Sequence, residues 1–170
     1  MLNVRMAEDS DIPAITRIYN EAIEDGGSTS DLVPQTLDQR RAWVESHVPP
    51  YAAFVAEEMA DDNDDDRGEV VGFCALSVFY DRPGYNGVGD LAYYVARDQH
   101  RHGIGGAMLD FLIAEARRRS MRKLIAVIFA NNAGSTALVS HAGFTRFGFL
   151  PNASRSTAGM HDLTYWFLDL

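Results

Sequence analysis

The residues best suited to chemistry lie in a basic, glycine-rich turn at positions 97–106. Gly103, Gly105 and Gly106 allow the backbone to approach a ligand closely and to adopt angles closed to other residues. Arg101 adds a positive charge, and the segment that follows has apolar residues at helical spacing. The first N–H groups of a helix lack internal partners and lie at the positive end of its dipole, so this turn is an anion site suited to a pyrophosphate.

Two common phosphate-binding motifs do not match this turn. A Walker A loop requires Gly-Lys-Ser/Thr where the chain has Gly105-Gly106-Ala107. A dinucleotide-binding fingerprint of the Rossmann type requires a third glycine where Met108 stands. The pyrophosphate loop of an acetyl-coenzyme A-dependent acetyltransferase and an ordinary glycine-rich turn both fit the string, so the flanking sequence has to decide between them.

Two elements must hold this turn in place, a strand before it and a helix after it. Leu91 to Ala96 is rich in aromatic and β-branched residues, which is typical of a strand. After Gly106, apolar residues recur at helical spacing as far as about Ser120. The same patterns predict further strands over 2–6, 51–57, 70–79, 124–129, 144–150 and 163–168, and helices over about 12–23, 36–47 and 135–141. The fold class is therefore α/β, with a mixed, mostly antiparallel sheet of about seven strands and helices on both faces.

Local signals set several boundaries. Asp9 or Ser10 is expected to cap the first helix, with Pro13 in its first turn. The strands over 51–57 and 70–79 are expected to form a hairpin, and residues 80–89 a loop rich in turn formers. The last two strands are expected to be separated by residues 151–160.

Length and charge indicate one domain over residues 1–170 with an acidic loop insertion at about 58–68. Residues 57–69 hold eight acids and one base, which contribute −7 of the net charge of −9. No basic face dominates the remainder, so we expect no nucleic-acid partner. No apolar run approaches the roughly 20 residues of a membrane span, so we expect no membrane partner either.

Metal, disulfide and export signals are weak. Asp61-x-Asn63-x-Asp65 suggests an EF-hand, but Asp66 replaces the required glycine and Gly72 the bidentate glutamate, so a solvated loop is expected. No carboxylate or cysteine completes a zinc set around the histidines, and we predict no metal site. Cys74, the single cysteine, is expected to be buried and excludes an internal disulfide. The N-terminus does not resemble a signal peptide, and a cytoplasmic location is expected.

The ordered motifs of the chain resemble those of the GNAT superfamily of N-acetyltransferases. His100-Arg101-His102-Gly103-Ile104-Gly105 is similar to its Arg/Gln-x-x-Gly-x-Gly/Ala signature. Asn132 to Leu138, followed by Gly143-Phe144, resembles its second segment. Further segments resemble the phosphinothricin and methionine sulfone acetyltransferases within that superfamily: Val4-Arg5, Asp11 to Asn20, Arg40 to Trp43, and His161-Asp162-x-x-x-Trp166.

The resemblance implies a GNAT-type α/β/α sandwich in which the central strand splays from its neighbour and binds acetyl-CoA. It implies that Tyr93, Tyr94 and Val95 offer backbone groups to the pantetheine arm. It also implies that Asn132 and Ser135 lie along the pantetheine. The implied pyrophosphate site consists of Arg101, His102, Gly103, Ile104, Gly105 and Gly106.

The resemblance also suggests which residues take the amine proton and which bind the acceptor. Asp90 and His161 match two catalytic positions of the subgroup, and either could be the general base. Arg82 and Tyr85 are candidate acceptor-binding residues. Val139 stands where many family members carry the tyrosine that protonates the departing thiolate. Solvent or another tyrosine such as Tyr94 must then serve, or the thiolate leaves unprotonated.

These observations predict an acetyl-CoA-dependent N-acetyltransferase that acts on the primary amine of a small molecule, an amino acid or an analogue, by direct attack in a ternary complex. Acetylation of a protein N-terminus is a second hypothesis, and a non-catalytic CoA-binding sensor is a third. The resemblance further implies a homodimer.

Overall fold

The computed structural model describes residues 1–59 and 68–170, and its strands form one sheet in the order β1-β2-β3-β4-β5-β7-β6. All described neighbours pair antiparallel except β4 and β5, which pair parallel. The strands are β1 (Leu2–Met6), β2 (Ala52–Glu58), β3 (Glu69–Val78), β4 (Val88–Val95), β5 (Lys123–Phe129), β6 (Thr145–Ser156) and β7 (Gly159–Asp169). The mixed, mostly antiparallel sheet expected from the sequence is confirmed.

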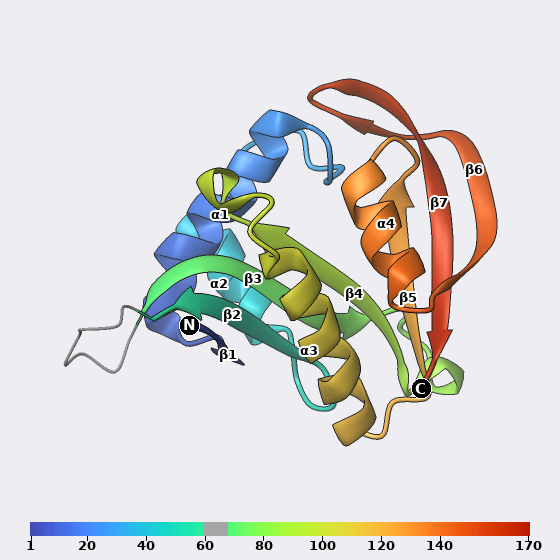
Figure 1. Cartoon of the computed structure of the whole chain (residues 1–170), viewed down its shortest axis with the longest axis horizontal. Helices are drawn as coiled ribbons and strands as arrows, with labels where there is room; N and C mark the ends of the chain where they lie inside the picture. The colour runs from blue at the N-terminus through green and yellow to red at the C-terminus, as the bar shows by residue number, and fades with distance from the viewer. Residues whose placement is uncertain (60–67) are drawn as a thin grey trace.

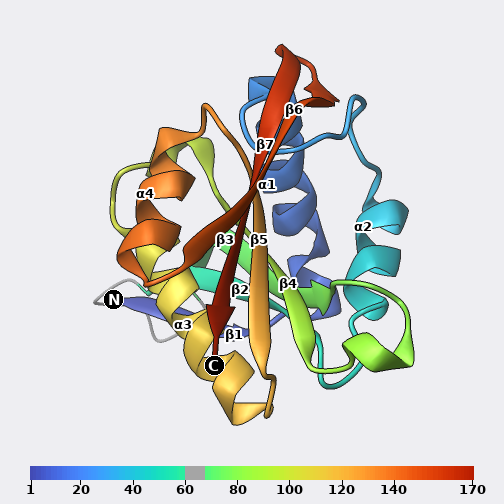
Figure 2. The same ribbon diagram turned by 90° about the vertical axis from the view of Figure 1, so that its right-hand side faces the viewer.

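Helices cover both faces of the sheet, as Figures 1 and 2 show. The helices are α1 (Ile12–Asp25), α2 (Leu37–Glu45), α3 (Ile104–Arg118) and α4 (Ala133–His141), joined by the short 3-10 turns η1 (Asp9–Asp11), η2 (Pro83–Tyr85) and η3 (Arg97–Gln99). Strand side chains alternate between faces, so Leu91 packs in the core cluster beneath α3 while Tyr94 packs against the cluster beneath α1. These two layers of apolar contact fix β4 between the helices.

The central strand separates from its neighbour part-way along its length. β4 and β5 are in register only at Val88 with Lys123, Gly89 with Leu124, and Asp90 with Ile125. Beyond Asp90, β4 stays paired with β3 and β5 stays paired with β7, so each strand keeps its outer partner while the two diverge. The resulting wedge is visible in Figure 1 and confirms the splayed central strand.

The first helix begins later than expected. Asp9 lies in η1, and Asp11 rather than Asp9 or Ser10 occupies the N-cap of α1. The carboxylate of Asp11 accepts hydrogen bonds from the Glu8 N–H at 2.8 Å and from the Arg5 guanidinium at 2.7 and 2.9 Å. These bonds stabilise the extra turn before the helix, which a capping signal alone does not reveal.

The expected separation of the last strands over 151–160 is wrong. β6 runs on to Ser156 and β7 begins at Gly159, so the two strands form a hairpin. Pro151 is tolerated because β6 is an edge strand, and Gly159 turns the chain with a φ of 123°. The register shifts between Leu150 and Ser154 absorb the irregular residues. The hairpin carries His161 towards the end of α1.

Two further observations concern the described residues. None of the helices they form is long and apolar enough to cross a membrane. Cys74 is fully buried in the core, and burial raises the pKa of its thiol. Most of the acidic insertion, including the EF-hand-like Asp61, Asn63 and Asp65, lies at residues 60–67, outside the described residues.

Candidate active site

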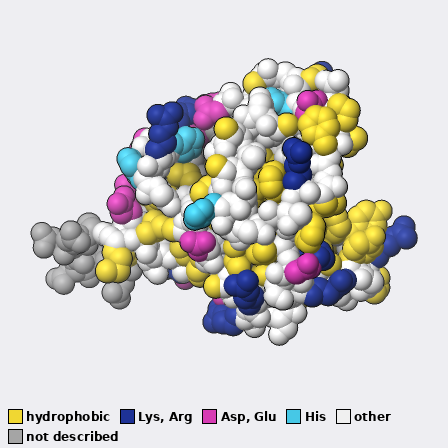
Figure 3. Space-filling model, turned by 45° about the vertical axis from the view of Figure 1, so that its right-hand side comes forward, with side chains coloured by type: hydrophobic (Ala, Val, Ile, Leu, Met, Phe, Trp, Pro, Cys, Tyr) yellow, Lys and Arg dark blue, Asp and Glu magenta, His cyan; other side chains and the backbone are white. Residues whose placement is uncertain are grey.

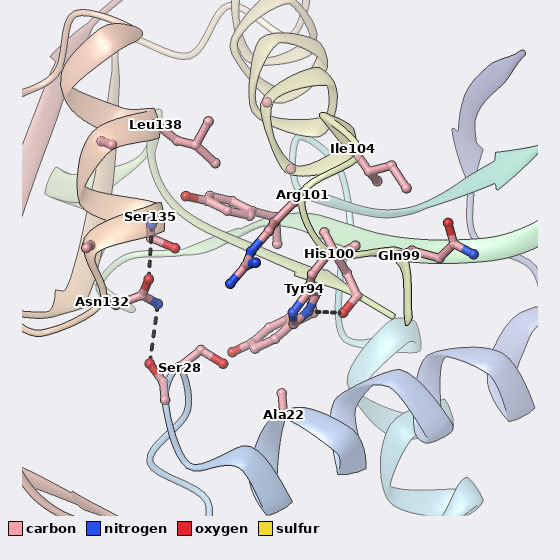
Figure 4. A pocket seen from close by; sticks show the side chains of 18 of the residues that line it. Ala22, Ser28, Tyr94, Gln99, His100, Arg101, Ile104, Asn132, Ser135 and Leu138 are labelled. Carbon is pink, nitrogen blue, oxygen red and sulfur yellow. Dashed lines mark hydrogen bonds between the residues drawn. The ribbon is translucent and has the colours of Figure 1, made fainter. Parts of the chain in front are cut away.

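A cleft of about 960 Å³ opens at the wedge between β4 and β5 (Figure 4). Its walls come from the end of α1 and the loop after it, the end of β4, the turn before α3, and the first turns of α4. Such a volume lies at the upper end of the range of small-molecule sites, roughly 300–1,000 Å³. The cleft therefore suits a long ligand that enters between two helices and reaches into the sheet.

The glycine turn forms one rim of this cleft. Gly103, at the N-cap of α3, has a φ of 82°, which favours glycine. A Cβ atom on Gly105 would lie 3.3 Å from Leu138 of α4, so glycine there lets α3 and α4 approach each other. Ile104 and Gly106 also line the cleft as expected, whereas His102 does not and is exposed, near the Gln99 side chain.

Arg101 carries an available positive charge into the cleft, where Figure 4 shows its guanidinium between Asn132 and Tyr94. It has no hydrogen bond or ion pair within the part of the chain that the structure describes. Arg97, which also lines the cleft, is instead paired with Glu24 and Asp25. Arg101 adopts a φ of 69°, a conformation that costs free energy for any residue but glycine. This strain at a site-facing cation points to a binding role.

Asn132 joins the opposite rim to the loop after α1. Its Oδ1 accepts the N–H of Ser135 at 3.0 Å, which caps α4, and its Nδ2 donates to the Gly27 carbonyl at 3.3 Å (Figure 4). Both polar groups of the Asn132 amide are thus engaged within the protein. Asn132 and Ser135 line the cleft at the expected place, and the geometry gives Asn132 the task of holding the loop.

The floor of the cleft is made by the three expected residues at the end of β4. Tyr94 stacks on Phe73 with ring centroids 5.1 Å apart, and burial raises the pKa of its phenol. The Val95 carbonyl accepts a hydrogen bond from His100 Nε2 at 3.1 Å. Tyr93 faces the α3 side, and its hydroxyl is buried with no hydrogen-bond partner among the described residues. Burial also raises the pKa of Tyr93.

A smaller cavity of about 70 Å³ extends the cleft into the wedge. Tyr93 and Tyr94 line it from β4, Phe129 from β5, and Ser28 and Ser135 from the two rims. Because the same two tyrosines also line the larger cleft, the two spaces meet at the end of β4. A ligand group that reaches this junction is surrounded by aromatic rings.

Asp90 lies at the apex of the wedge, in the last pair between β4 and β5. Its Oδ1 is buried and has no partner among the described residues, and this burial raises the pKa of the carboxyl to about 7. Ala92, two residues further on the same face, lines the smaller cavity. Two strand residues span about 7 Å, so Asp90 can reach the cavity through a water molecule.

His161 approaches the wedge from the opposite arm. Its ring stacks on that of Phe129, with centroids 4.1 Å apart and planes 9° apart. The Ser156 hydroxyl lies 2.6 Å from the Gly26 carbonyl and 2.7 Å from His161 Nε2. Since a carbonyl can only accept, the hydroxyl donates to Gly26, and His161 Nε2–H donates to the hydroxyl. In this tautomer Nδ1 holds the lone pair that can take a proton.

Asp90 and His161 share the α1 side of the sheet. Ile125, which pairs with Asp90, and Phe129 both point to this side, because the intervening Ala126 and Ile128 pack in the α3 cluster. His161 stacks on Phe129 there. The structure thus brings both expected base candidates to one face, at the two ends of the wedge.

The other expected residues lie elsewhere. Arg82 and Tyr85 are exposed on the β3–β4 connection and pack against Tyr80, and neither lines either cavity. Val139 is fully buried in the core and does not line the cleft. The described residues contain no cluster of three or more His, Cys, Asp or Glu side chains that could hold a metal ion.

The sequence analysis missed two contributors to the site. The buried hydroxyl of Tyr93 was not predicted, because its position depends on how α4 packs. Burial raises the pKa of this phenol, and the neighbouring Ser135 side chain lowers it in part. The charged end of α1, where Glu21 and Asp25 line the cleft, was also missed. The ion pairs of Glu24 and Asp25 with Arg97 come from the meeting of α1 with the end of β4, which no local pattern indicates.

Known proteins share this architecture. Residues 13–144 match the Acetyltransferase (GNAT) family. The chain is 30% identical over 169 residues to the L-methionine sulfoximine/L-methionine sulfone acetyltransferase of Pseudomonas aeruginosa, across 99% of this chain and 94% of that protein. The structure of a phosphinothricin acetyltransferase from Sinorhizobium meliloti in complex with AcCoA has a TM-score of 0.87 and 26% identity, covering 99% of this chain and 88% of that one. A ribosomal-protein-alanine N-acetyltransferase from Brucella melitensis has a TM-score of 0.90 and 32% identity over 99% of both chains.

Proposed function

The chain belongs to the GNAT family of acetyltransferases, and from this premise we propose that it transfers the acetyl group of acetyl-CoA to the amine of an amino acid or amino-acid analogue. The observation that carries the proposal is the wedge between β4 and β5, with an anion site at its mouth. Two candidate proton acceptors, Asp90 and His161, lie on one face of that wedge.

The residues around the cleft fit acetyl-CoA, which supplies the activated acetyl group. Arg101 and the free N–H groups at the start of α3 are suited to the pyrophosphate. Among the described residues, the edge of β4 that faces the wedge has no strand partner beyond Asp90, so Tyr93 to Val95 can pair with an extended pantetheine arm as another strand would. Asn132 and Ser135 flank that arm from α4.

Asp90 is the base in this proposal. A carboxyl whose pKa is raised to about 7 is ionised in a large fraction of molecules at neutral pH, and it binds a proton more strongly than an ordinary aspartate does. It takes the amine proton through water from the apex of the wedge. His161 Nδ1, at the other end, orients the amine through its lone pair.

Tyr93 assists the leaving group. Val139 is buried in the core, so it offers nothing to the departing sulfur. Tyr93 lines both cavities, and its buried hydroxyl has no partner among the described residues. Burial raises the pKa of this phenol, so at neutral pH it keeps the hydrogen with which it donates to the thiolate.

The acceptor class follows from the relatives named for amino-acid analogues. An acceptor of this class carries a carboxylate. Arg82 is the proposed contact for it, although the guanidinium and Tyr85 both pack against Tyr80 outside the two cavities, so the acceptor would have to reach them from the β3–β4 connection. Acetylation of a protein N-terminus is the second candidate, because the Brucella melitensis neighbour is named a ribosomal-protein-alanine N-acetyltransferase.

The test measures thiol release from acetyl-CoA with amino acids, amino-acid sulfones, polyamines and an alanine-initiated peptide as acceptors. The proposal predicts turnover with the amino-acid class, loss of at least about 100-fold in kcat for Asp90→Asn, and a raised acceptor KM for Arg82→Ala. Turnover confined to the peptide would replace this function with the second candidate. Acetyl-CoA binding without turnover on any acceptor would instead favour a CoA-binding sensor.

Assembly and location complete the proposal. We expect a homodimer, because β6 is a long edge strand with exposed Phe147, Phe149 and Leu150. On the same side of the molecule, the upper right of Figure 3 shows hydrophobic side chains. A cytoplasmic location fits a chain whose single cysteine, Cys74, is buried as a thiol.

A further inference from the structure

A histidine outside the cleft is hydrogen-bonded on both ring nitrogens. His47 follows the last turn of α2, where its Nδ1 lies 2.7 Å from the Trp43 carbonyl and its Nε2 lies 2.8 Å from the Ser77 hydroxyl of β3. The Trp43 ring packs edge-on at a centroid distance of 4.4 Å. His47 is half-buried, so the ring connects the sheet with the surface.

These two contacts determine which atom donates and which accepts in the hydrogen bonds that join Trp43, His47 and Ser77. The Trp43 carbonyl can only accept, so His47 Nδ1 carries its hydrogen. The neutral ring then has its lone pair on Nε2, and Ser77 must donate its single hydroxyl hydrogen there. Burial lowers the pKa of His47, and although the hydrogen bond to the Trp43 carbonyl opposes this, the charge of Arg40 on α2 adds to the lowering. The net direction is downward, so the ring is neutral at rest. The Ser77 Oγ atom still has lone pairs that can accept a hydrogen bond from a neighbouring side chain.

The neighbour of Ser77 across the sheet is Asp90. The two residues are directly opposite in the antiparallel pairing of β3 with β4. Side chains in such a pair lie on the same face with Cβ atoms about 4.5–5.5 Å apart. The buried Oδ1 of Asp90 has no partner among the described residues, so a protonated Asp90 can turn its O–H towards the Ser77 oxygen.

We propose that Ser77 and His47 relay the proton of the acceptor amine from Asp90 to solvent. This inference rests on the proposed function, in which Asp90 is the base. The Asp90 O–H bond breaks as its proton bonds to Ser77 Oγ, while the Ser77 O–H bond breaks as its hydrogen bonds to His47 Nε2. Asp90 is again a carboxylate, and His47 is an imidazolium that releases one proton to water. One proton enters from the amine and one leaves, and no other reactant is needed.

The burial around His47 gives the relay its direction. The charge of Arg40, on α2, lowers the pKa of His47, whereas the hydrogen bond to the Trp43 carbonyl raises it. On the side of the sheet, Ser77 lies between the ring and Asp90. Arg40 disfavours the imidazolium, so the proton passes on rather than remaining there. The route ends at the half-buried His47, which contacts β3 through Ser77 and lies outside the cleft.

The experiment compares Ser77→Ala, Ser77→Thr and His47→Gln, each measured for kcat, for the KM of acetyl-CoA and for its pH profile. Ser77→Ala removes the hydroxyl, Ser77→Thr keeps it, and the glutamine amide can keep both hydrogen bonds but cannot take a proton. Ser46→Ala is the matched control, because the exposed Ser46 hydroxyl donates to the same Trp43 carbonyl at 2.7 Å and lies outside the relay.

The relay predicts a fall of about tenfold in kcat for Ser77→Ala and His47→Gln, with an unchanged KM for acetyl-CoA. Ser77→Thr and Ser46→Ala keep the wild-type kcat, and added imidazole buffer restores much of the rate of His47→Gln by accepting the proton from outside. Equal kcat in Ser77→Ala and wild type overturns the relay, as does an equal loss in Ser77→Ala and Ser77→Thr, which indicates a packing role.

The failure of the relay and that of the proposed function give different results. If Asp90→Asn abolishes turnover while Ser77→Ala is fully active, only the relay is wrong. If Asp90→Asn is fully active, Asp90 is not the base, and the relay falls with that assignment. If His47→Gln fails to fold, the two Ser77 variants decide the question, since both substitutions are small.

Discussion

Asp90 illustrates how one residue can be costly for the fold and useful for the reaction. Its carboxyl is buried without a hydrogen bond from the described residues, and the burial raises its pKa to about 7. Below that pH the group is neutral and cannot take a proton. We therefore expect kcat/KM for the acceptor to rise with pH through about 7 and then level off. The profile is measured at saturating acetyl-CoA and subsaturating acceptor amine, with the amine's own ionisation corrected for. A flat profile between pH 6 and 8 would contradict the assignment of Asp90 as the base.

The same shift predicts a gain in stability on removing the charge. The folded state holds its proton up to about pH 7, whereas the unfolded chain releases it near pH 3.8, so stability falls as pH rises between these values. Asp90→Asn removes the charge that is costly above pH 7. We expect it to stabilise the protein by about 1–3 kcal/mol at pH 8 and by less at pH 5, which corresponds to a rise in Tm of several degrees.

Thermal melts of Asp90→Asn and wild type at pH 5 and pH 8 measure this directly. Asp162→Asn is a suitable control, since Asp162 is an acid on β7 whose Oδ1 accepts the Asn152 N–H. A stability difference for Asp90→Asn that does not grow with pH would show that the carboxyl is neutralised or solvated in some other way.

The proposed role of Tyr93 is best tested by measuring the rate of the reaction in a variant. Tyr93→Phe removes one hydroxyl that has no partner among the described residues, so the fold should tolerate it. The hydrogen bond to the departing sulfur exists only as negative charge develops, so its loss should lower kcat by about tenfold to 100-fold and leave the KM of acetyl-CoA unchanged. Steady-state kinetics with both substrates varied separates the two effects.

Tyr51→Phe is the matched control for Tyr93→Phe. Tyr51 packs against the same core cluster but lines neither cavity, so we expect wild-type kinetics from it. An equal loss of kcat in both variants would mean that tyrosine hydroxyls matter for the core rather than for the leaving group.

At the scale of elements, the turn between β4 and α3 combines strain with charge. Arg101 has a φ of 69° and directs its guanidinium into the cleft (Figure 4). Arg101→Gly relieves the backbone and should stabilise the protein by about 0.5–1 kcal/mol. The same change removes a phosphate-binding cation and should weaken CoA binding by about tenfold. Melting temperature and calorimetric titration with CoA measure the two effects.

Arg101→Ala separates the two causes, because it removes the charge and keeps the strain. It should weaken CoA binding as much as Arg101→Gly does, without the gain in stability, and the salt dependence of binding should fall in both. If Arg101→Ala binds CoA as tightly as wild type, the guanidinium does not contact the pyrophosphate.

The elements differ in how much of them the sequence could reveal. The β4–turn–α3 unit was predicted closely, because its strand residues, its glycines and its helical spacing are all local signals. The β6–β7 hairpin was not, because Pro151, Asn152 and Gly159 are loop formers, and only the position of β6 at the sheet edge makes them acceptable there. Edge position is a property of the whole sheet, so no window of sequence contains it.

In the candidate site, too, local features could be predicted from the sequence and tertiary contacts could not. Asp90 and His161 could be singled out by resemblance, but their common face depends on the pairing of β5 with both β4 and β7. The tautomer of His161 depends on Ser156 and on the Gly26 carbonyl 130 residues from Ser156. The link between His47 and Ser77 likewise joins α2 to β3 across 30 residues. Residue types were predictable, whereas contacts set by tertiary packing were not.

At the scale of the whole molecule, the two edge strands of the sheet differ in length and in the polarity of their side chains. β1 is only five residues long, and its polar Asn3 and Arg5 bond to Glu57. β6 is 12 residues long and exposes Phe147 and Phe149, each 55% exposed. Proteins usually protect an open edge with short strands or charges, and β6 has neither over its apolar stretch. We expect a second copy of the chain to cover this edge.

This edge bears on activity because the β6–β7 hairpin carries His161 and Ser156. A partner that packs on β6 would hold the hairpin in place, so loss of the dimer should lower kcat as well as the molecular mass. We expect the wild-type chain to elute at twice 18.8 kDa in size-exclusion chromatography with light scattering. Phe149→Glu should elute as a monomer and turn over more slowly.

Met6→Glu is the control for Phe149→Glu, because Met6 lies on the opposite edge strand and is 57% exposed. It introduces the same charge on a large apolar residue of equal exposure, and it should leave both the mass and the kcat unchanged. A monomeric wild-type chain would refute the dimer outright. A dimer that survives Phe149→Glu but not Met6→Glu would move the interface to β1, and His161 would then owe its position to α1 and Phe129 alone.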